Sequence, residues 1–335
     1  MKTGILLVNL GTPDSPSTGD VRKYLRQFLN DPRVIDISAV GRFFLVNMVI
    51  VPFRAARSAK LYAKIWSDKG SPLLYYSNRQ KEMLQQSLGS NYVVELGMRY
   101  QSPSIRQALE NLRRAGCGAI RVIPLFPQYA SASTGSVHQE IMKVMKKWEV
   151  IPQLELVNSY CDNKGFIASF AEIGKKYDPD SFDHVLMSFH GLPERQIRKA
   201  GDSKCLNGAC CEAFTSRNAF CYRAQCHATA RLLAQELGIP KEKMTVCFQS
   251  RLGRTPWIRP YSDEVIADRA KKGDKKILAF SPAFTSDCLE TIYEIATEYN
   301  EIFKSHGGEK IQLVESLNDN SRWIDTLREL AVAKL

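Results

Sequence analysis

A histidine at the end of a hydrophobic run is the residue of this chain best placed for proton or metal chemistry. His190 closes the run Val185–His190, and the Gly191-Leu192-Pro193 that follows predicts a tight turn presenting the ring to a cleft. A neutral imidazole there can accept a proton or bind a metal near physiological pH. Histidines at strand ends more often serve packing or hydrogen bonding, so position alone assigns no role.

Three glutamates offer a second reactive group. Glu290, Glu294 and Glu298 recur at every fourth residue of an expected helix, Asp287–Lys304, which stacks their carboxylates on one face. Ser286 or Asp287 is expected to be its N-cap. The row is either a solvated acidic face or a ladder that guides a hard divalent cation or carries protons away. The spacing alone does not distinguish these interpretations.

Cysteines cluster in one segment, Cys205-x4-Cys210-Cys211-x9-Cys221-x4-Cys226, which holds five of the nine in the chain. With no export signal, this number argues against a disulfide framework. Thiolates at short intervals suit zinc or an iron–sulfur cluster, and His227 could replace one of them in a zinc site. Free thiols in a loop are the alternative. The remaining cysteines are expected to be isolated and buried: Cys117, Cys161, Cys247 and Cys288.

The elements that must position these residues are short aliphatic runs typical of buried parallel strands. Helical patterns separate most of them, which predicts an α/β fold with helices on both sheet faces. The runs are Gly4–Leu10, Tyr92–Gly97, Ile120–Leu125, Leu154–Ser159, Val185–His190, Met244–Ser250, Ile277–Ser281 and Ile311–Ser316.

The spacing of the runs divides the chain into two similar halves. We predict two Rossmann-like domains, at 1–165 and 166–317, with the cysteine segment as an insertion at 201–226 and a terminal helix at 318–335. In such sheets, ligands bind at the carboxyl ends of the strands, where His190 lies. A dinucleotide site is excluded, because the turn after the first run, Gly11 to Pro16, lacks the Gly-x-Gly-x-x-Gly pattern.

Composition limits the partners. Lysines and arginines number 46 against 35 aspartates and glutamates, but no run of like charges forms a nucleic-acid stripe. The longest apolar stretch, Phe43–Phe53, is interrupted by Asn47 and Pro52 and is about half the length needed to cross a bilayer. It could line an apolar cleft, rest on a lipid surface or form a buried helix. We therefore expect a cytoplasmic protein, with peripheral contact to the inner membrane as one option.

Six motifs in order resemble those of ferrochelatases, over about residues 4 to 317. The histidine motif is Ser188-Phe189-His190-Gly191-Leu192-Pro193 and the glutamate motif is Thr285 to Glu294. The other four are Leu7 to Pro13, Gly70-Ser71-Pro72-Leu73, Pro124 to Tyr129, and Gln249 to Gly253 with Trp257. Leu10 departs from members that place a tyrosine near the metal.

The resemblance implies an enzyme that inserts ferrous iron into protoporphyrin, gripped in a cleft between the two domains. It places His190 and Glu290 on opposite sides of the macrocycle, as proton acceptor and iron-binding carboxylate or with these roles partly exchanged, with Glu294 and Glu298 behind Glu290. The porphyrin contacts it implies are Arg54, Arg57, Ser71, Arg99, Tyr100, Tyr129, Gln249 and Trp257.

Some bacterial ferrochelatases carry a 2Fe–2S cluster on internal cysteines, so the resemblance favours a cluster over zinc. The implied ligands are Cys205, one of Cys210 and Cys211, Cys221 and Cys226. Two alternatives to ferrochelatase remain at this stage. One is a chelatase of the same fold for another tetrapyrrole or metal, and the other is a non-catalytic porphyrin or haem carrier with a redox-sensing cluster.

Overall fold

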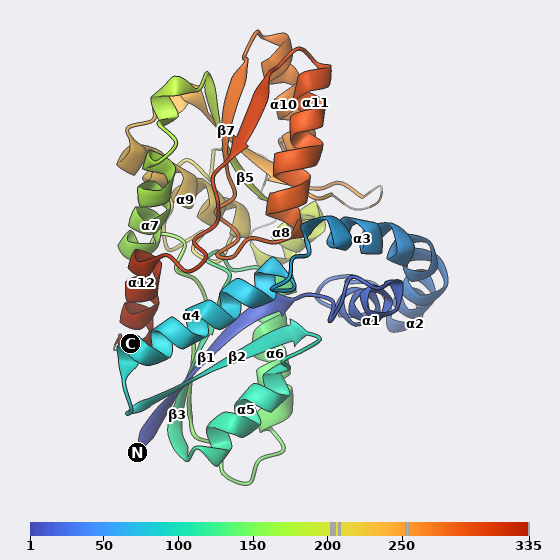
Figure 1. Ribbon diagram of the computed structural model, residues 1–335. Coiled ribbons are helices and arrows are strands. Elements are labelled where there is room, and N and C mark those ends of the chain that lie inside the picture. Colours follow the sequence, from blue (N-terminus) through green and yellow to red (C-terminus); the bar gives the residue numbers. More distant parts are fainter. Residues whose placement is uncertain (202–205, 207–208, 252, 254, 334–335) are drawn as a thin grey trace. The chain divides into compact units, whose positions relative to one another are not determined.

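The computed structural model describes residues 1–201, 206, 209–251, 253 and 255–333. The chain forms two compact units (Figure 1). The first comprises Met1–Phe126, Ala130–Asn158 and the chain from Ile324 onward, and the second comprises Pro127–Tyr129 and Ser159–Trp323. Each holds a four-stranded parallel sheet flanked by helices, which confirms the predicted α/β class and all eight predicted strands.

The sheet of the first unit has the order β2-β1-β3-β4. Its strands are β1 (Lys2–Gly11), β2 (Tyr92–Tyr100), β3 (Cys117–Pro124) and β4 (Gln153–Leu156), and its main covering helices are α4 (Pro72–Leu88), α5 (Ile105–Arg114) and α6 (Ser136–Met145).

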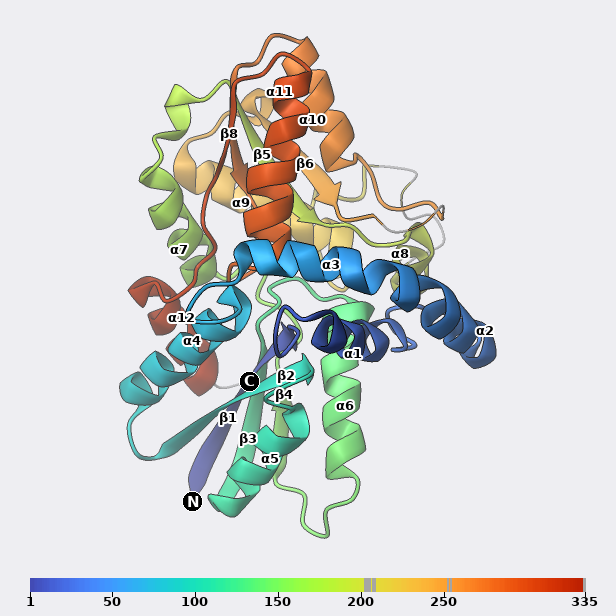
Figure 2. The same ribbon diagram turned by 45° about the vertical axis from the view of Figure 1, so that its right-hand side comes forward.

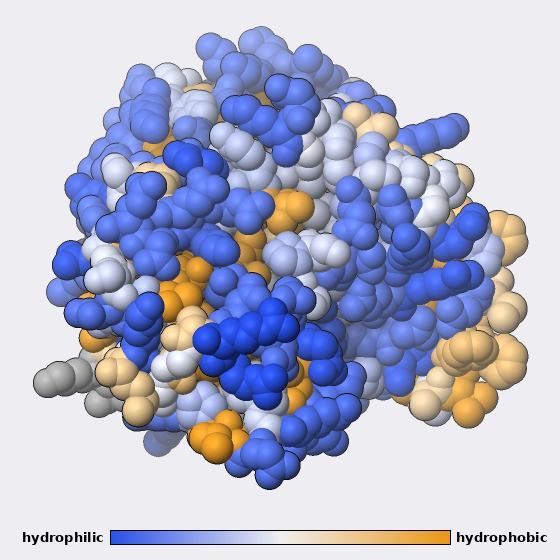
Figure 3. Space-filling view, turned by 60° about the horizontal axis from the view of Figure 1, so that its bottom comes forward, coloured by the Kyte–Doolittle hydropathy of each residue, from blue (hydrophilic) through white to orange (hydrophobic). Residues whose placement is uncertain are grey.

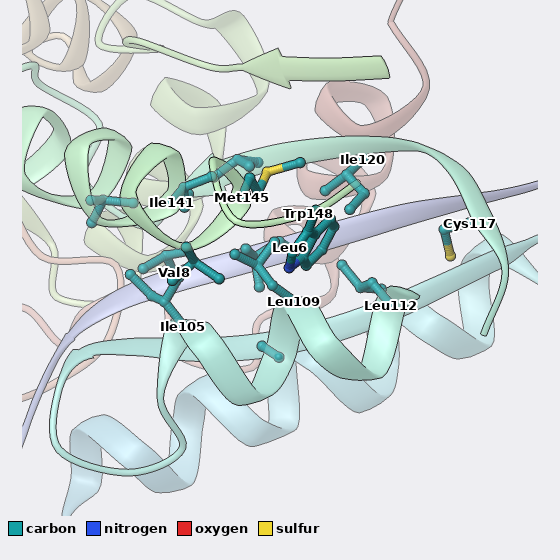
Figure 4. Close-up of a cluster of buried hydrophobic side chains, with 14 residues drawn as sticks. Leu6, Val8, Ile105, Leu109, Leu112, Cys117, Ile120, Ile141, Met145 and Trp148 are labelled. Carbon is teal, nitrogen blue, oxygen red and sulfur yellow. The ribbon is translucent and has the colours of Figure 1, made fainter. Parts of the chain in front are cut away.

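Both faces of this sheet are covered because alternate side chains of β1 point to opposite sides. Leu6 and Val8 pack with α5 and α6 in a buried core (Figure 4). Asn9 lies on the other face, where its amide Nδ2 donates to Ser77 Oγ of α4 at 3.0 Å.

A continuous helical segment follows the first helix, α1 (Thr18–Leu29). It consists of α2 (Ala39–Phe44), the π-helix η1 (Leu45–Ile50) and α3 (Val51–Ile65). The apolar stretch Phe43–Phe53 lies within this longer helical segment, and Pro52 stands at the start of α3 without ending it. The resulting stretch, Ala39–Ile65, is long and apolar enough to cross a membrane by length and composition alone.

One side of this segment is buried and the other is exposed. Val46, Val51 and Ala55 are fully buried, and α3 and η1 pack against α1. The opposite side exposes large apolar side chains, which gather at the right of Figure 3: Val40, Phe43, Phe44, Leu45, Met48, Val49 and Phe53. The segment is therefore an amphipathic helix.

The sheet of the second unit, β6-β5-β7-β8, repeats the arrangement of the first. Its strands are β5 (His184–His190), β6 (Met244–Gln249), β7 (Lys276–Phe280) and β8 (Lys310–Leu313). Its helices are α7 (Lys164–Lys175), α8 (Glu194–Ala200), α9 (Tyr222–Leu237), α10 (Ser262–Lys271), the π-helix η5 (Glu290–Tyr299) and α11 (Asn300–Ser305); α12 (Ser321–Val332) follows, and from Ile324 it groups with the first unit.

The core of the second unit decides which way His190 points. Leu186 of β5 is buried with Ile266 of α10 and Ile295 of η5, and Figure 2 shows α10 and α11 along one side of this sheet. Because side chains alternate along a strand, Ser188 and His190 share the face of Leu186. The strand therefore directs the imidazole to the side covered by η5.

Candidate active site

His190 is half-buried at the carboxyl end of β5. Its ring Nδ1 lies 2.7 Å from the carbonyl oxygen of Gly191. Only a protonated Nδ1 can donate to a carbonyl, so in the neutral ring Nε2 carries the free lone pair. The ring stands edge-on to Phe284, with centroids 6.4 Å apart. The sequence segment therefore yields an imidazole with one nitrogen held and the other available to accept a proton.

The turn after His190 requires glycine at position 191. The Gly191 N–H donates to the Gln249 carbonyl at 2.8 Å. A Cβ on Gly191 would lie 2.8 Å from that oxygen and 3.2 Å from Cε3 of Trp257. Beyond it, the Ile258 N–H donates to Leu192 O at 3.0 Å. These contacts confirm the predicted turn and show that β6 and the Trp257 segment hold it.

The glutamates lie on a π-helix rather than on the expected α-helix. Neither Ser286 nor Asp287 is the N-cap, since Leu289 precedes the helix. Buried Asp287 instead accepts from the Thr291 hydroxyl at 2.9 Å. In a π-helix the hydrogen bonds span five residues, so side chains four or five apart share a face. Glu290 and Glu294 are half-buried and Glu298 is exposed.

The Glu294 carboxylate is held by several donors. The backbone N–H of Ser250 lies 2.9 Å from Oε1, and the Ser250 hydroxyl donates to Oε2. The Tyr299 hydroxyl donates at 2.9 Å and Gln249 Nε2 at 3.3 Å. Ser250 adopts a positive φ of 64°, a conformation uncommon outside glycine that often marks functional sites.

Electrostatic interactions link His190, Glu290 and Glu294. Burial raises the pKa of Glu294, and the negative charge of Glu290 raises it further. The hydrogen bonds from Ser250 and Tyr299 lower it, as does the positive charge of a protonated His190. The structure therefore brings the histidine and both inner glutamates within electrostatic reach of one another.

Gln249 connects the strands to the glutamate helix. It is buried, and its Oε1 accepts from the Ser188 hydroxyl at 2.7 Å. Its Nε2 donates to the Glu290 carbonyl at 3.1 Å as well as to Glu294. The amide thereby fixes the start of η5 against β5. Sequence reasoning gave Gln249 a porphyrin contact and missed Ser250, although Ser250 directly follows β6.

Cys288 is less isolated than expected. It is buried, which raises the pKa of its thiol, and the thiol hydrogen-bonds with the carboxylate of Glu290. The Glu290 side chain therefore has a neighbour of its own, two residues earlier in the chain. The sequence offered a signal, because both residues stand in the glutamate motif.

Arg99 and Tyr100 lie in a buried polar network of the first unit. Arg99 Nη2 donates to Asp31 Oδ2 at 2.6 Å, and the Tyr100 hydroxyl donates to the same oxygen at 2.9 Å. Ser136 Oγ donates to it at 2.5 Å. Sequence reasoning did not identify Asp31, whose partners lie far along the chain.

The other residues expected to contact porphyrin differ in exposure. Arg54 and Arg57 are exposed on α3. Ser71 is buried, and its hydroxyl oxygen accepts from Thr12 Oγ1 at 2.9 Å. In the second unit, the Tyr129 backbone N–H donates to Gln225 Oε1 at 2.6 Å, and Trp257 is half-buried.

The cysteine segment is only partly described, since Cys205 lies outside the described residues. Cys210 is exposed, and its sulfur lies 4.0 Å from that of buried Cys211. Cys221 and Cys226 are buried, and their thiols interact electrostatically with Cys211 and with each other, while Cys226 also interacts with Cys161. Cys161 is thus not isolated, contrary to expectation. Within the described part of the chain, no three metal-binding side chains group closely enough to hold an ion.

Basic side chains of α9 surround Cys211. Arg223 Nη1 donates to its sulfur at 3.2 Å, and Arg231 Nη1 donates to its carbonyl at 2.5 Å. Burial raises the pKa of this thiol to about 11, against the opposing effect of the Arg223 charge. Arg223 Nε and His227 Nε2 are buried without a hydrogen-bond partner. Buried polar nitrogens without a hydrogen-bond partner are rare and call for an explanation.

Comparison with known proteins decides the family. The family model described as Ferrochelatase matches residues 2–335. The chain belongs to the ferrochelatase family. Ferrochelatases are lyases that insert ferrous iron into a porphyrin in haem synthesis, and this chain is an enzyme of that kind. Neither alternative, the chelatase for another tetrapyrrole or the carrier, is favoured.

Relatives and solved structures agree with this assignment. The chain is 44% identical over 331 residues to a ferrochelatase of Legionella pneumophila (strain Paris), covering 98% of both chains. It is 42% identical over 343 residues to a ferrochelatase of Coxiella burnetii (strain Dugway 5J108-111), covering 100% of this chain and 94% of the relative.

Among solved structures, SirB from Bacillus subtilis with Fe3+ is similar, with a TM-score of 0.54 at 15% identity, covering 99% of this chain and 96% of that chain. The sirohydrochlorin chelatase SirB from Bacillus subtilis subspecies spizizenii in complex with cobalt has a TM-score of 0.52 at 12% identity, with the same coverage. At these identities the likeness supports the chelatase fold alone.

Proposed function

We propose that His190 is the base that accepts protons from the pyrrole nitrogens while iron enters the macrocycle. The supporting observation is that His190 and Glu290 both act electrostatically on Glu294, at the carboxyl end of β5. With Nδ1 donating to Gly191 O, Nε2 has its lone pair free. Metal insertion releases two protons from the porphyrin. A fixed imidazole at the carboxyl end of β5 can accept these protons as they are released.

We propose that Glu290, Glu294 and Glu298 bind and deliver ferrous iron at the same active site. Glu294 is fixed by donors from Ser250 and Tyr299, which suits a carboxylate that must keep its position. Glu290 stands one turn nearer to the start of η5, and Glu298 is exposed. Carboxylate oxygens suit ferrous iron as it sheds water, so the row offers a path from solvent to Glu290.

An anaerobic assay with ferrous iron and protoporphyrin tests both roles. His190→Ala is expected to abolish haem formation without unfolding the protein, and Glu290→Gln is expected to lower kcat at least a hundredfold. His306→Ala, which changes an exposed histidine of the same unit, is the matched control. Substantial turnover by His190→Ala in folded protein would reject this assignment.

The porphyrin contacts are proposed on the resemblance, supported by side-chain chemistry. Arg54 and Arg57 are exposed cations, and Arg can bind a propionate with two hydrogen bonds. Arg54→Ala is expected to raise KM for porphyrin while changing kcat little. A more carboxylated porphyrin assayed in parallel would distinguish protoporphyrin from coproporphyrin as the preferred substrate. Equal KM values for the wild type and Arg54→Ala would reject the contact.

We further propose a 2Fe–2S cluster on four of Cys205, Cys210, Cys211, Cys221 and Cys226. The electrostatic interaction among the thiols of Cys211, Cys221 and Cys226 supports it. The buried Arg223 Nε also supports it, because its N–H could donate a hydrogen bond to an inorganic sulfide of the cluster. Such a cluster would supply an electron-accepting group with a structural or sensory role. Cys221→Ser is expected to remove its visible absorption and Cys117→Ser, in the first unit, to retain it. A colourless protein with stoichiometric zinc would favour zinc instead.

The amphipathic segment α2–η1–α3 is proposed to contact the membrane peripherally, as expected of a cytoplasmic enzyme at the inner membrane. Its buried side packs on α1, which favours lying along a bilayer surface over crossing it. Arg54, Arg57 and Lys60 are exposed beside the apolar face and suit anionic lipid.

A vesicle assay tests the membrane contact. Phe53→Asp is expected to abolish sedimentation with phosphatidylglycerol vesicles. Val150→Asp changes another exposed apolar residue of the first unit and should not affect it. Binding by Phe53→Asp at the wild-type level would reject the contact.

A further inference from the structure

Tyr222 connects the cysteine segment to the main chain of His190. It is the first residue of α9 and directly follows Cys221. Its hydroxyl donates to the His190 carbonyl oxygen at 2.8 Å. Tyr222 is buried, and burial raises the pKa of its hydroxyl well above the ordinary value, so the group stays protonated and able to donate. Neither the histidine motif nor the glutamate motif contains this residue.

The Tyr222 hydroxyl donates to the His190–Gly191 peptide unit, which is hydrogen-bonded through both its carbonyl and its N–H. The carbonyl of the His190–Gly191 peptide accepts from Tyr222, and its N–H donates to Gln249 O at 2.8 Å. The β5 ladder with β6 ends at His190, so the Tyr222 hydroxyl supplies a donor where strand pairing stops. Since the imidazole Nδ1 donates to the next carbonyl, Gly191 O, the orientation of this peptide also sets the orientation of the ring.

Tyr222 reaches His190 from the face of the sheet opposite the glutamates. On that face, the His227 ring of α9 packs near Phe248, with centroids 6.5 Å apart. Phe248 alternates along β6 with Cys247, which lies in the core on the η5 side. The ring of His190 therefore points toward η5 while α9 holds its main chain from behind.

The same hydroxyl is tied to the cysteine segment. It hydrogen-bonds with the sulfur of Cys226, one helical turn further along α9. The segment before the helix is fastened locally, because the Cys221 N–H donates to Asn218 O at 2.9 Å and Gln225 Nε2 donates to Ala219 O at 2.6 Å. Tyr222 is thus bonded to the Cys226 side chain and joined through its own peptide to Cys221.

We propose that Tyr222 is a positioning residue that couples the state of the Cys221–Cys226 turn to the orientation of His190. The inference rests on the proposed role of His190 as the proton acceptor. It does not depend on which group the cysteines bind, since any change in their contacts alters the position of Tyr222. Small displacements of a catalytic group lower rates steeply, up to about a hundredfold for roughly 1 Å.

Tyr222→Phe removes only the hydroxyl and is the first test. We expect kcat for haem formation to fall roughly tenfold, with KM for porphyrin within about twofold of the wild type. Tyr177→Phe is the matched control, because it removes a hydroxyl that donates to Glu315 elsewhere in the same unit. Wild-type kcat in Tyr222→Phe would overturn the proposal, whereas an active His190→Ala variant would instead overturn the proposed function beneath it.

A double-mutant cycle tests the coupling itself. Cys221→Ser is expected to lower kcat in the wild-type background and to have little further effect in Tyr222→Phe, because the connection is already broken. Additive effects would overturn the coupling. The NMR signal of the His190 ring in 15N-histidine-labelled protein gives a second test. It requires neither turnover nor a folded Tyr222→Phe variant. Cys221→Ser should shift this signal and leave that of His306 unchanged, and an unshifted His190 signal would also overturn the coupling.

Discussion

Replacing Asp31 with asparagine tests how the first unit uses Arg99 and Tyr100. The Asp31 carboxylate is buried, and its Oδ2 accepts from Arg99, Tyr100 and Ser136. Asparagine keeps the size of the side chain but removes the charge. The Arg99 guanidinium, whose side chain is 13% exposed, then remains as a nearly buried cation without its counter-ion.

The expected cost follows from that uncompensated charge. Breaking a buried ion pair by removing one partner typically destabilises a protein by about 3–5 kcal/mol. For a unit of this size, each kcal/mol lowers Tm by about 2–4 °C. Asp31→Asn should therefore lower the Tm of the first unit by roughly 6–20 °C.

Thermal unfolding followed by circular dichroism measures this difference. Glu82→Gln, an exposed carboxylate of the same unit that pairs with Arg79, is the control and should leave Tm nearly unchanged. Adding Arg99→Met to Asp31→Asn should recover part of the loss, because no buried charge then remains unpaired. A Tm for Asp31→Asn within about 2 °C of the wild type would refute the reasoning and favour Arg99 as a ligand-facing cation.

Three further predictions concern the turn, the core and pH. Gly191→Ala should lower kcat at least tenfold, because its Cβ would press on Gln249 O, and wild-type kinetics would contradict the geometry of the turn. Leu109→Ala removes a fully buried side chain and should reduce the free energy of unfolding in urea by about 2–5 kcal/mol, with kcat unchanged below the melting transition. Burial lowers the pKa of His184 to about 4, so its neutral form stabilises the fold above about pH 6.5 and this stabilisation is lost as the pH falls toward 4. His184→Gln should flatten the decline in urea stability between pH 7 and 4.5, and an unchanged slope would show that another group is responsible.

Local patterns in the sequence determined the fold class and the position of the histidine. Each predicted strand is a short aliphatic run, and burial on both faces of a parallel sheet is what such runs reflect. The turn after His190 was predictable because Gly191, which has no side chain, permits a close turn and Pro193 fixes its own φ. The family motifs are equally local.

The helical form of two segments was decided by more than local pattern. Spacing predicted an α-helix for the glutamates, but η5 is a π-helix. The carbonyl of its first residue, Glu290, accepts a hydrogen bond from Gln249 of strand β6. Composition marked Phe43–Phe53 as a short, interrupted apolar stretch, whereas the structure places it within one helical segment, Ala39–Ile65. Helix propensities of single residues do not distinguish the five-residue hydrogen-bond spacing of a π-helix from the four-residue spacing of an α-helix.

The sequence supplied the reactive groups, whereas their partners came only from the tertiary structure. Glu294 takes its donors from Ser250, which lies 44 residues away, and His190 is held by Tyr222, which lies 32 residues away. Asp31 meets Arg99 across 68 residues. Alternation along a strand fixes which face a side chain takes, but the topology of the sheet decides which helix covers that face. The histidine and the glutamates could therefore be named from the sequence, while the contacts that orient them required the folded chain.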